Sequence, residues 1–341
     1  MIRKKIRTYT SSAGHSKIWE QSGLITEYAS RPLVPVTLAN LIQLANENDM
    51  TETAMHTYTQ LPLRLARRVA SIHKLPYIVG VNPFITAVSD MYHSSFLRVL
   101  NLKPPTNTAN REKLTATLAE LTNAHQSVIP NLARGFMESR TYISQESAKM
   151  FLDEMIRARI GIRVIAEHYL ALQTTRPGWI GVIDTRTNPI DILKHVAGRV
   201  QDLCDINYGS APEFVFAGGT PLFAYIPVHL DYIFMEVLKN AARATVEQSH
   251  KIGRHEHPPV HVSISQTDDN VVVRIRDQGG GIPATDTHNV WQYSYTTVPE
   301  AAADDDFLAI QSQMMMQQAS GGPIAGLGFG LPMSRIYGSS I

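Results

Sequence analysis

The sequence predicts an α+β chain in which an N-terminal helical bundle is followed by an α/β sandwich. Between about residues 35 and 172, apolar residues recur every three or four positions, with few Gly or Pro. After Thr174, short strand patterns alternate with helical ones. A length of 341 residues is enough for two domains. We therefore predict a tail over 1–20, a helical domain over 21–174 and a second domain over 175–341.

Two helical stripes carry the prediction of the bundle. The first repeats at alternating spacings of four and three, through Leu114, Leu118, Leu121, His125, Val128 and Leu132. The second repeats at four, through Leu152, Ile156, Ile160 and Val164. Long amphipathic helices with short connections are typical of an up-and-down bundle.

The second half is predicted to contain a sheet with one face covered by helices. Strand patterns occur at Trp179–Ile183, Glu213–Ala217, Phe223–Ile226, Val260–Ser265 and Asn270–Arg276. The last two alternate apolar and polar residues around a turn, which indicates a hairpin. Helices are expected between the first two strands, marked by Leu193, Val196, Val200 and Leu203, and from Pro227 to about Gln248.

Composition excludes several classes of protein. The net charge of +1 argues against a general nucleic-acid binder. No apolar run reaches the ~18 residues that a membrane span needs. Cys204 is the single cysteine, so no internal disulfide forms, which fits a reducing compartment. The first nineteen residues are basic, hydroxyl-rich and free of acids, which is typical of either a mitochondrial transit peptide or an ordinary solvated tail.

A candidate site begins on the helix that Pro227 opens. Glu236, Asn240 and Arg243 stand at i, i+4 and i+7 and so share one helix face. A carboxamide oxygen is a hard ligand suited to Mg²⁺, and a carboxylate one turn away can take a proton from a nucleophile. The alternative interpretation is a solvated face with an incidental Glu–Asn pair.

Two glycine-rich segments follow this helix. Asp277 ends a strand and precedes three glycines that would let the backbone approach a ligand, while its carboxylate can accept a hydrogen bond from adenine. The segment 326–332 alternates glycines ahead of a helix and can aim backbone N–H groups at phosphates. Taken singly, the first can equally be a flexible turn and the second a structural loop.

In this order, with the 43 residues 283–325 between the two glycine-rich segments, the three motifs resemble the N, G1 and G2 boxes of the Hsp90–gyrase–MutL–histidine kinase ATPases. The long loop then resembles their ATP lid. A closer resemblance is to the mitochondrial pyruvate and branched-chain 2-oxo acid dehydrogenase kinases. It is carried by EVLKNAARAT (236–245), DQGGGIP (277–283), YTT (295–297) and GLGFGLPMSR (326–335), and upstream by YASRPLVPVTL (28–38), LPYIVGVNP (75–83) and RIGIRVIAEHYLAL (159–172).

This resemblance implies a set of site residues. It makes Glu236 the general base, Asn240 the Mg²⁺ ligand and Asp277 the adenine contact. It adds ATP contacts at Lys239, Arg243, Gly279, Gly281, Thr296, Thr297, Gly326, Leu327, Gly328, Phe329, Gly330 and Leu331.

Two further assignments come from the resemblance. His125 matches a bundle histidine that reaches toward the catalytic Glu, although its place on an apolar stripe also suits a core histidine. Val290, Gln292 and Tyr295 align with a K⁺ site, in which Gln292 stands where the family has an acid.

The implied function is an ATP- and Mg²⁺-dependent protein serine kinase of the mitochondrial matrix. It would inactivate a 2-oxo acid dehydrogenase complex by phosphorylating its E1α subunit, dock on the lipoyl domain of E2 and form a homodimer. The sequence does not decide between the pyruvate and branched-chain complexes.

Two other functions stay open. One is a two-component histidine kinase, although His125 is followed by Gln126 rather than by an acid. The other is a nucleotide-binding scaffold without transfer activity. The kinase is the leading interpretation. The scaffold is credible because the chain ends soon after the last glycine-rich segment, where the family continues with more strands, so the expected sheet is truncated at its C-terminal side.

Overall fold

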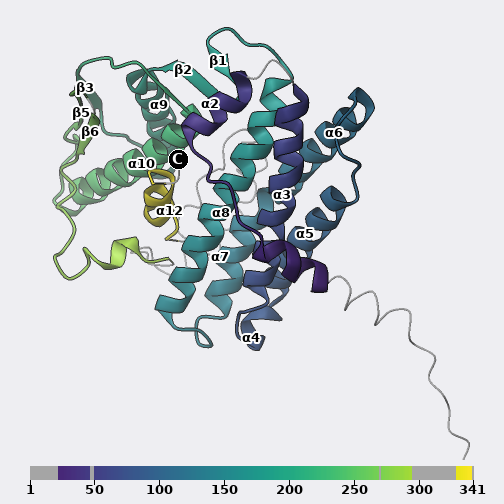
Figure 1. Cartoon of the computed structure of the whole chain (residues 1–341). Helices are drawn as coiled ribbons and strands as arrows, with labels where there is room; N and C mark the ends of the chain where they lie inside the picture. The colour runs from purple at the N-terminus through teal and green to yellow at the C-terminus, as the bar shows by residue number, and fades with distance from the viewer. Residues whose placement is uncertain (1–21, 47–49, 269, 294–327, 340–341) are drawn as a thin grey trace, which may run out of the picture.

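The computed structural model describes residues 22–46, 50–268, 270–293 and 328–339. The predicted tail over 1–20 lies outside these residues. The first half is helical, as expected. Residues 22–30 form a helix, and they are followed by α2 (Leu38–Asn46), α3 (Met50–Ile72), α4 (Tyr77–Gly80), α5 (Pro83–Leu100), α6 (Thr108–Ala124), α7 (Val128–Glu138) and α8 (Gln145–Leu172) (Figure 1).

The first predicted stripe is buried throughout, but it does not lie on one continuous helix. A 3₁₀ turn, η1 (His125–Ser127), separates α6 from α7. The cause is Pro130, which has no N–H to donate and whose ring clashes with the carbonyl four residues earlier, at Gln126. The break changes the direction of the chain at His125. The His125 side chain stays inside the bundle and is 5% exposed.

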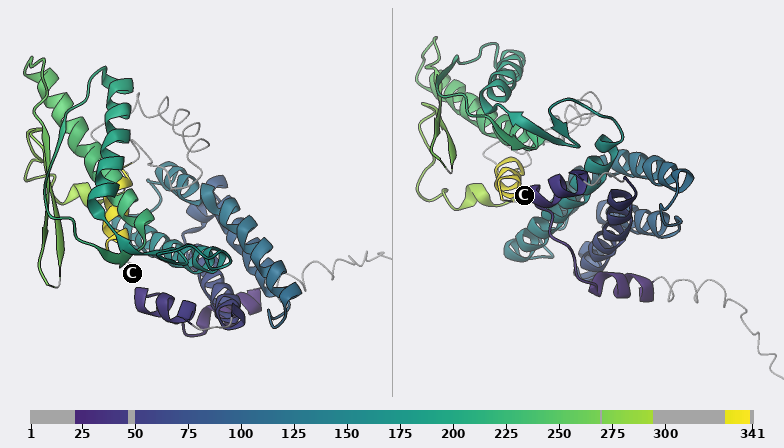
Figure 2. Two further views of the ribbon diagram at one scale, coloured as in Figure 1. Left: turned by 90° about the horizontal axis from the view of Figure 1, so that it is seen from above. Right: turned by 45° about the horizontal axis from the view of Figure 1, so that its top comes forward.

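A three-stranded sheet forms the side of the second half that faces away from the helical bundle (Figure 1). Its strand order is β3 (Phe214–Gly218), β5 (Val260–Gln266), β6 (Val271–Arg276), parallel between the first two and antiparallel between the last two. The apolar side chains of β5 are buried against α9 (Pro189–Tyr208) and α10 (Pro227–Lys251). Figure 2 shows these two helices on one face of the sheet, so the expected helix-covered face is confirmed.

One predicted strand boundary was wrong, and it lies in a second, smaller sheet. The segment Trp179–Ile183, expected to be one strand, is divided between β1 (Trp179–Ile180) and β2 (Ile183–Thr187), which pair antiparallel and continue to β4 (Phe223–Tyr225). Gly181 makes the turn with a φ of 57°, and a Cβ there would meet the His168 ring. The reversal needs a left-handed residue in close contact with α8, which strand periodicity does not reveal.

The two halves share one apolar core where they meet. The short helix α12 (Gly330–Tyr337) lies between α10 and α8 (Figure 1). Its buried residues Met333 and Ile336 join the core of the helical bundle, together with Tyr232 from α10. The first glycine of α12 is therefore fixed from both sides, by the bundle and by the sheet-bearing half.

Candidate nucleotide site

Helix α10 presents a buried carboxylate next to an exposed carboxamide. Glu236 is only 2% exposed, and its Oε1 accepts a 2.9 Å hydrogen bond from Lys239 Nζ. A buried carboxylate needs such a partner, because an isolated charge in the interior is strongly destabilising. Asn240, one turn further, is exposed. Arg243, the third residue predicted on this face, donates its Nε to Glu247 Oε1 at 2.6 Å.

The last glycine-rich segment is pressed against the Glu236 carboxylate. A Cβ at Gly330 would lie 2.0 Å from Glu236 Oε2, a distance that no side chain tolerates. Gly330 is the first residue of α12, whose N-terminal N–H groups have no side-chain cap. The N-terminus of α12 therefore stands beside the candidate base, and a larger residue at position 330 would have to displace the buried Glu236 side chain.

The first glycine-rich segment packs against the same helix further along. A Cβ at Gly279 would lie 2.4 Å from the Cβ of Ala244 on α10. Gly280 and Gly281 adopt φ values of 90° and 77°, which other residues rarely tolerate. Asp277 Oδ1 accepts a 2.9 Å hydrogen bond from the Gly279 N–H. Its second oxygen, Oδ2, has no hydrogen-bond partner among the described residues.

These contacts bring the three predicted motifs together. Glu236, Asn240 and Ala244 stand at i, i+4 and i+8, so they line one face of α10. At a rise of 1.5 Å per residue, Gly330 and Gly279 meet this face about 12 Å apart, with Asn240 between them. An elongated ligand lying along α10 would meet the Glu236 carboxylate and the start of α12 at one end. At the other end it would meet the Asp277 carboxylate and the backbone of the first glycine-rich segment.

The remaining predicted ATP contacts divide into two sets. Gly328, with φ 67°, Phe329 and Leu331 flank Gly330 at the start of α12. The Phe329 side chain is 1% exposed and belongs to the core, so only its backbone can face a ligand. A second set lies outside the described residues: Thr296, Thr297, Gly326 and Leu327.

His125 lies in the bundle, with contacts typical of a core histidine. Its Nε2 and the Ser95 hydroxyl are 2.7 Å apart, its ring meets Tyr92 edge-on, and Arg159 donates to its carbonyl. Burial, aided by the charges of Arg159 and Arg163, lowers the pKa of His125 to about 4. The structure thus shows a neutral ring held by its own domain, and a role for His125 toward Glu236 stays a prediction.

The predicted K⁺ ligands are only partly described. Val290 lies in the 3₁₀ turn η2 (Asn289–Trp291), followed by half-buried Gln292. Tyr295 lies outside the described residues. Within the part of the chain that is described, no three acidic, histidine or cysteine side chains gather as they would around a metal. In the same residues, no helix is both long and apolar enough to cross a bilayer.

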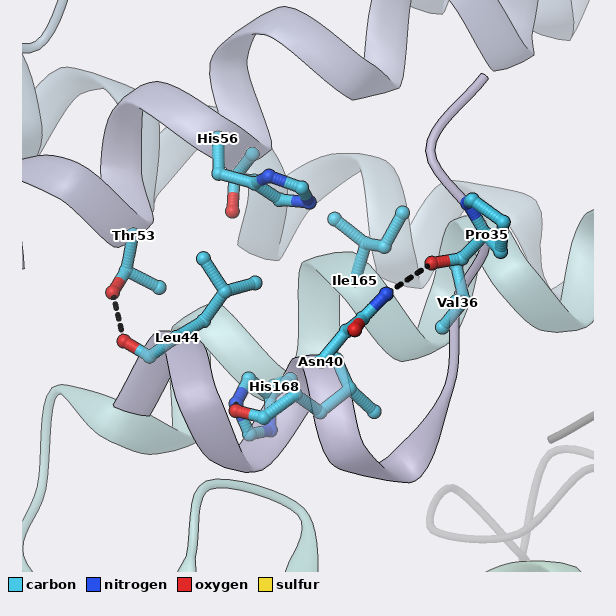
Figure 3. Close-up of a pocket in the computed structure, with 10 residues that line it drawn as sticks. Pro35, Val36, Asn40, Leu44, Thr53, His56, Ile165 and His168 are labelled. Atoms are coloured by element: carbon cyan, nitrogen blue, oxygen red, sulfur yellow. Dashed lines mark hydrogen bonds between the residues drawn. The ribbon is translucent and has the colours of Figure 1, made fainter. Parts of the chain in front are cut away.

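Two small cavities in the described part lie in the helical half, away from Glu236. Figure 3 shows one of them, enclosed by α2, α3 and α8 and lined by Asn40, His56 and His168 among others. The second is lined largely by apolar side chains, with His125 and Ser95 at its wall. Neither cavity touches the three motifs that meet on α10.

Comparisons with known proteins match both halves of the chain to described families. Residues 35–184 match the family described as mitochondrial branched-chain alpha-ketoacid dehydrogenase kinase. Residues 225–337 match the family described as histidine kinase-, DNA gyrase B- and HSP90-like ATPase. The second match contains all three motifs that meet on α10. The first covers most of the helical bundle, and the two matches follow one another along the chain in the order that the sequence predicts.

Together, the two matches cover most of the chain, and they agree with the kinase family that its motifs resemble. Its relatives among characterised proteins include pyruvate dehydrogenase (acetyl-transferring) kinase 1, mitochondrial, of Saccharomyces cerevisiae, which is 29% identical over 92% of this chain and 80% of the relative. The Arabidopsis thaliana kinase is 27% identical over 85% of this chain and 79% of the relative. Human isozyme 1 is 27% identical over 97% of this chain and 78% of the relative.

Because the ATPase match and the kinase relatives imply a site for ATP, the place where Glu236, Gly330 and Asp277 converge is the candidate for that site. Two residues near the site were not expected from the sequence. Tyr293 and Asp153 join the segment before the second glycine-rich motif to the bundle by a 2.6 Å hydrogen bond. No sequence signal marks this pair, because its members are 140 positions apart and neither belongs to a motif.

Proposed function

We propose that this chain is an ATP-dependent protein serine kinase that phosphorylates the E1α subunit of a 2-oxo acid dehydrogenase complex and inactivates that complex. The observation that carries the proposal is the contact between Gly330 and the buried Glu236 carboxylate. It sets a potential proton acceptor beside a helix N-terminus able to receive phosphate groups.

Glu236 is the group in the right place to accept the proton of a serine hydroxyl. Its Oε1 is held by Lys239, so Oε2, which faces Gly330 and has no hydrogen-bond partner in the described part of the chain, is the oxygen that would accept the proton. The serine oxygen would form a bond to the γ-phosphorus while the bond from that phosphorus to the β-phosphate breaks, and ADP would leave. Positioning and charge stabilisation dominate such a transfer, which suits a site built from backbone N–H groups.

Asn240 is the residue suited to hold Mg²⁺ together with the phosphates. Its carboxamide is exposed on the face of α10 that both glycine-rich segments touch. Mg²⁺ in nucleotide sites keeps few protein ligands and takes the rest of its shell from phosphates and water, so a single hard oxygen fits this ion. When bound, the ion would neutralise the charge of the phosphates.

The other end of the site suits the adenine base. Asp277 has one carboxylate oxygen fixed by the Gly279 N–H and the other without a partner among the described residues. That oxygen can accept a hydrogen bond from the exocyclic amine of adenine. The predicted K⁺ site near Val290 and Gln292 is tested by the dependence of nucleotide affinity on KCl.

The relatives guide the choice of substrate. Their names call them pyruvate dehydrogenase kinases and mitochondrial, whereas the match over 35–184 names the branched-chain enzyme. We propose the pyruvate dehydrogenase complex as the first target to test and the mitochondrial matrix as the location. We also propose that the helical domain docks on the lipoyl domain of E2 and that the kinase acts as a homodimer.

The test is to incubate the protein and radiolabelled ATP with each purified complex. The expected result is a stable phosphoserine on E1α of the pyruvate dehydrogenase complex and loss of dehydrogenase activity. Label on the branched-chain E1α alone would reassign the substrate. ATP binding without transfer to either complex would favour a scaffold, and acid-labile phosphohistidine on the chain itself would favour a histidine kinase.

A further inference from the structure

The loop between the two glycine-rich segments contains a tyrosine that is bonded to the helical domain. Tyr293 follows η2, and its hydroxyl donates to Asp153 Oδ1 on α8 at 2.6 Å. Lys149, one turn earlier on α8, holds the other oxygen of Asp153 at 2.5 Å and lies over the Tyr293 ring, 5.9 Å from its centre. Burial, followed by the hydrogen bond to Asp153, raises the pKa of Tyr293, so its hydroxyl stays a donor.

The ring of the same tyrosine contacts the glycine-rich segment. The Tyr293 and Phe329 rings are 4.8 Å apart and tilted by 55°. Phe329 is 1% exposed and immediately precedes Gly330, whose backbone lies against the Glu236 carboxylate. A side chain this well packed moves only together with its neighbours, so the position of the Tyr293 ring limits where the start of α12 can lie.

A continuous line of contacts therefore runs from the helical domain to the candidate base. It passes from the Asp153 carboxylate on α8 to Tyr293, from there to Phe329, and ends where Gly330 meets Glu236. α12 also packs directly on α8, as Figure 1 shows, so the line is short and crosses the boundary between the halves once.

We infer that Tyr293 is a positioning residue of the nucleotide site, and that its bond to Asp153 sets the distance between Gly330 and Glu236. The inference rests on the proposed ATP site. Its content is that the Tyr293 hydroxyl, in addition to the direct packing of α12 on α8, holds the phosphate-binding end of that site in place. The adenine end, at Asp277 and Gly279, packs on α10 and does not depend on it.

The variant that isolates this bond is Tyr293→Phe, which keeps the ring against Phe329 and removes only the hydroxyl. A hydrogen bond to a charged group contributes enough to change an equilibrium by about tenfold or more. We expect ATP affinity in the presence of Mg²⁺ to fall by roughly three- to tenfold, because losing the bond loosens the start of α12, which would bind the phosphates, and only part of the lost bond energy appears in binding. Adenosine affinity should stay unchanged, because the base lies at the other end of α10.

Tyr58→Phe is the matched control, because it also removes one half-buried tyrosine hydroxyl. That hydroxyl donates to the Leu102 carbonyl within the helical bundle, at 3.1 Å, away from α12. Asp153→Asn is the second test variant. It keeps an oxygen that can accept the hydrogen bond from the Tyr293 hydroxyl but removes the negative charge, so its loss of ATP affinity should be smaller than that of Asp153→Ala.

The experiment measures ATP and adenosine affinity by calorimetry, and the melting temperature without ligand, for each variant of the full chain. Failure of the unaltered protein to bind ATP would count against the proposed function itself. If that protein binds ATP while Tyr293→Phe only melts lower and binds as well, the inference is overturned. It is supported if Tyr293→Phe and Asp153→Ala each weaken ATP and the double variant weakens it no further than either one.

Discussion

Gly330 lies against the carboxylate of Glu236 so closely that a Cβ would come within 2.0 Å of Oε2. This contact joins the end of the described chain to the middle of α10 and brings a helix N-terminus to a buried acid. The same helix face receives Gly279 at Ala244, with Asn240 between the two contacts. The account of function follows from this arrangement, and each of its parts can be tested by a single substitution.

Gly330→Ala tests the close contact itself. The added methyl group must displace either the carboxylate or the start of α12, and overpacking of this kind costs about 1–3 kcal/mol. We expect loss of phosphoryl transfer and a lower melting temperature. Gly198→Ala is the control, because a Cβ there meets nothing within 4 Å and the residue lies in helix α9. The account is contradicted if both variants transfer phosphate equally well.

Asn240→Ala should remove Mg²⁺-dependent ATP binding. The carboxamide is the hard oxygen donor on the shared face of α10, and the substitution leaves Glu236 in place. We expect ATP affinity in Mg²⁺ to fall at least tenfold, or about 1.4 kcal/mol, with little change in EDTA. Asn123→Ala, at an exposed position of α6, serves as the control. Unchanged affinity in Mg²⁺ would remove Asn240 from the site.

Asp277→Ala should weaken ATP far more than inorganic triphosphate. A carboxylate at the adenine end reads the base, and an unpaired buried amine costs about 1–3 kcal/mol. This corresponds to about ten- to hundredfold in ATP affinity. Competition assays with both ligands measure the difference. Equal losses for the two would show that Asp277 acts on the phosphates or on the fold of the turn at Gly279.

Acid should destabilise the protein through three buried histidines. Burial is the largest cause that lowers the pKa of His125, His168 and His229, each to about 4. The unfolded chain binds these protons near pH 6.5 while the folded chain does not. Stability is therefore complete above pH 6.5 and falls as pH drops toward 4, by about 1.4 kcal/mol per pH unit for each histidine.

His229→Phe isolates one of these three contributions. The ring is retained beside Tyr337, 5.0 Å away, and the titrating group is lost. Denaturant unfolding between pH 6.5 and 4.5 should show a slope shallower by about 1.4 kcal/mol per pH unit than that of the unaltered protein. An unaltered slope for His229→Phe would mean that this ring is protonated in the folded state.

The sequence predicts most of the architecture, because periodicity reports which residues are buried. The stripe from Leu114 to Leu132 is buried as expected, and only the break at His125 was missed, where Pro130 ends the α-helical hydrogen bonding. The hairpin at Gly181 was missed for a related reason. It depends on a left-handed glycine that packs against His168, which lies on another element.

The site was predicted residue by residue, but its distances were not. Motif order indicates that Glu236, Asp277 and Gly330 serve one ligand, yet only the structure shows that Gly330 touches the carboxylate. The pair formed by Asp153 and Tyr293 could not be predicted, since contacts across 140 residues leave no periodic signal in a single sequence. Such pairs depend on how α8 packs beside α12, which is a property of the whole fold.

Glu236→Gln gives the most direct test of the central claim, that a carboxylate on α10 activates the acceptor serine. The amide is close in size to the carboxylate and cannot accept the serine proton. We predict ATP affinity within about twofold of the unaltered protein and transfer to E1α slower by roughly 10²–10⁴-fold. Glu112→Gln, at an exposed position of α6, should transfer normally. Near-normal transfer by Glu236→Gln would contradict the account.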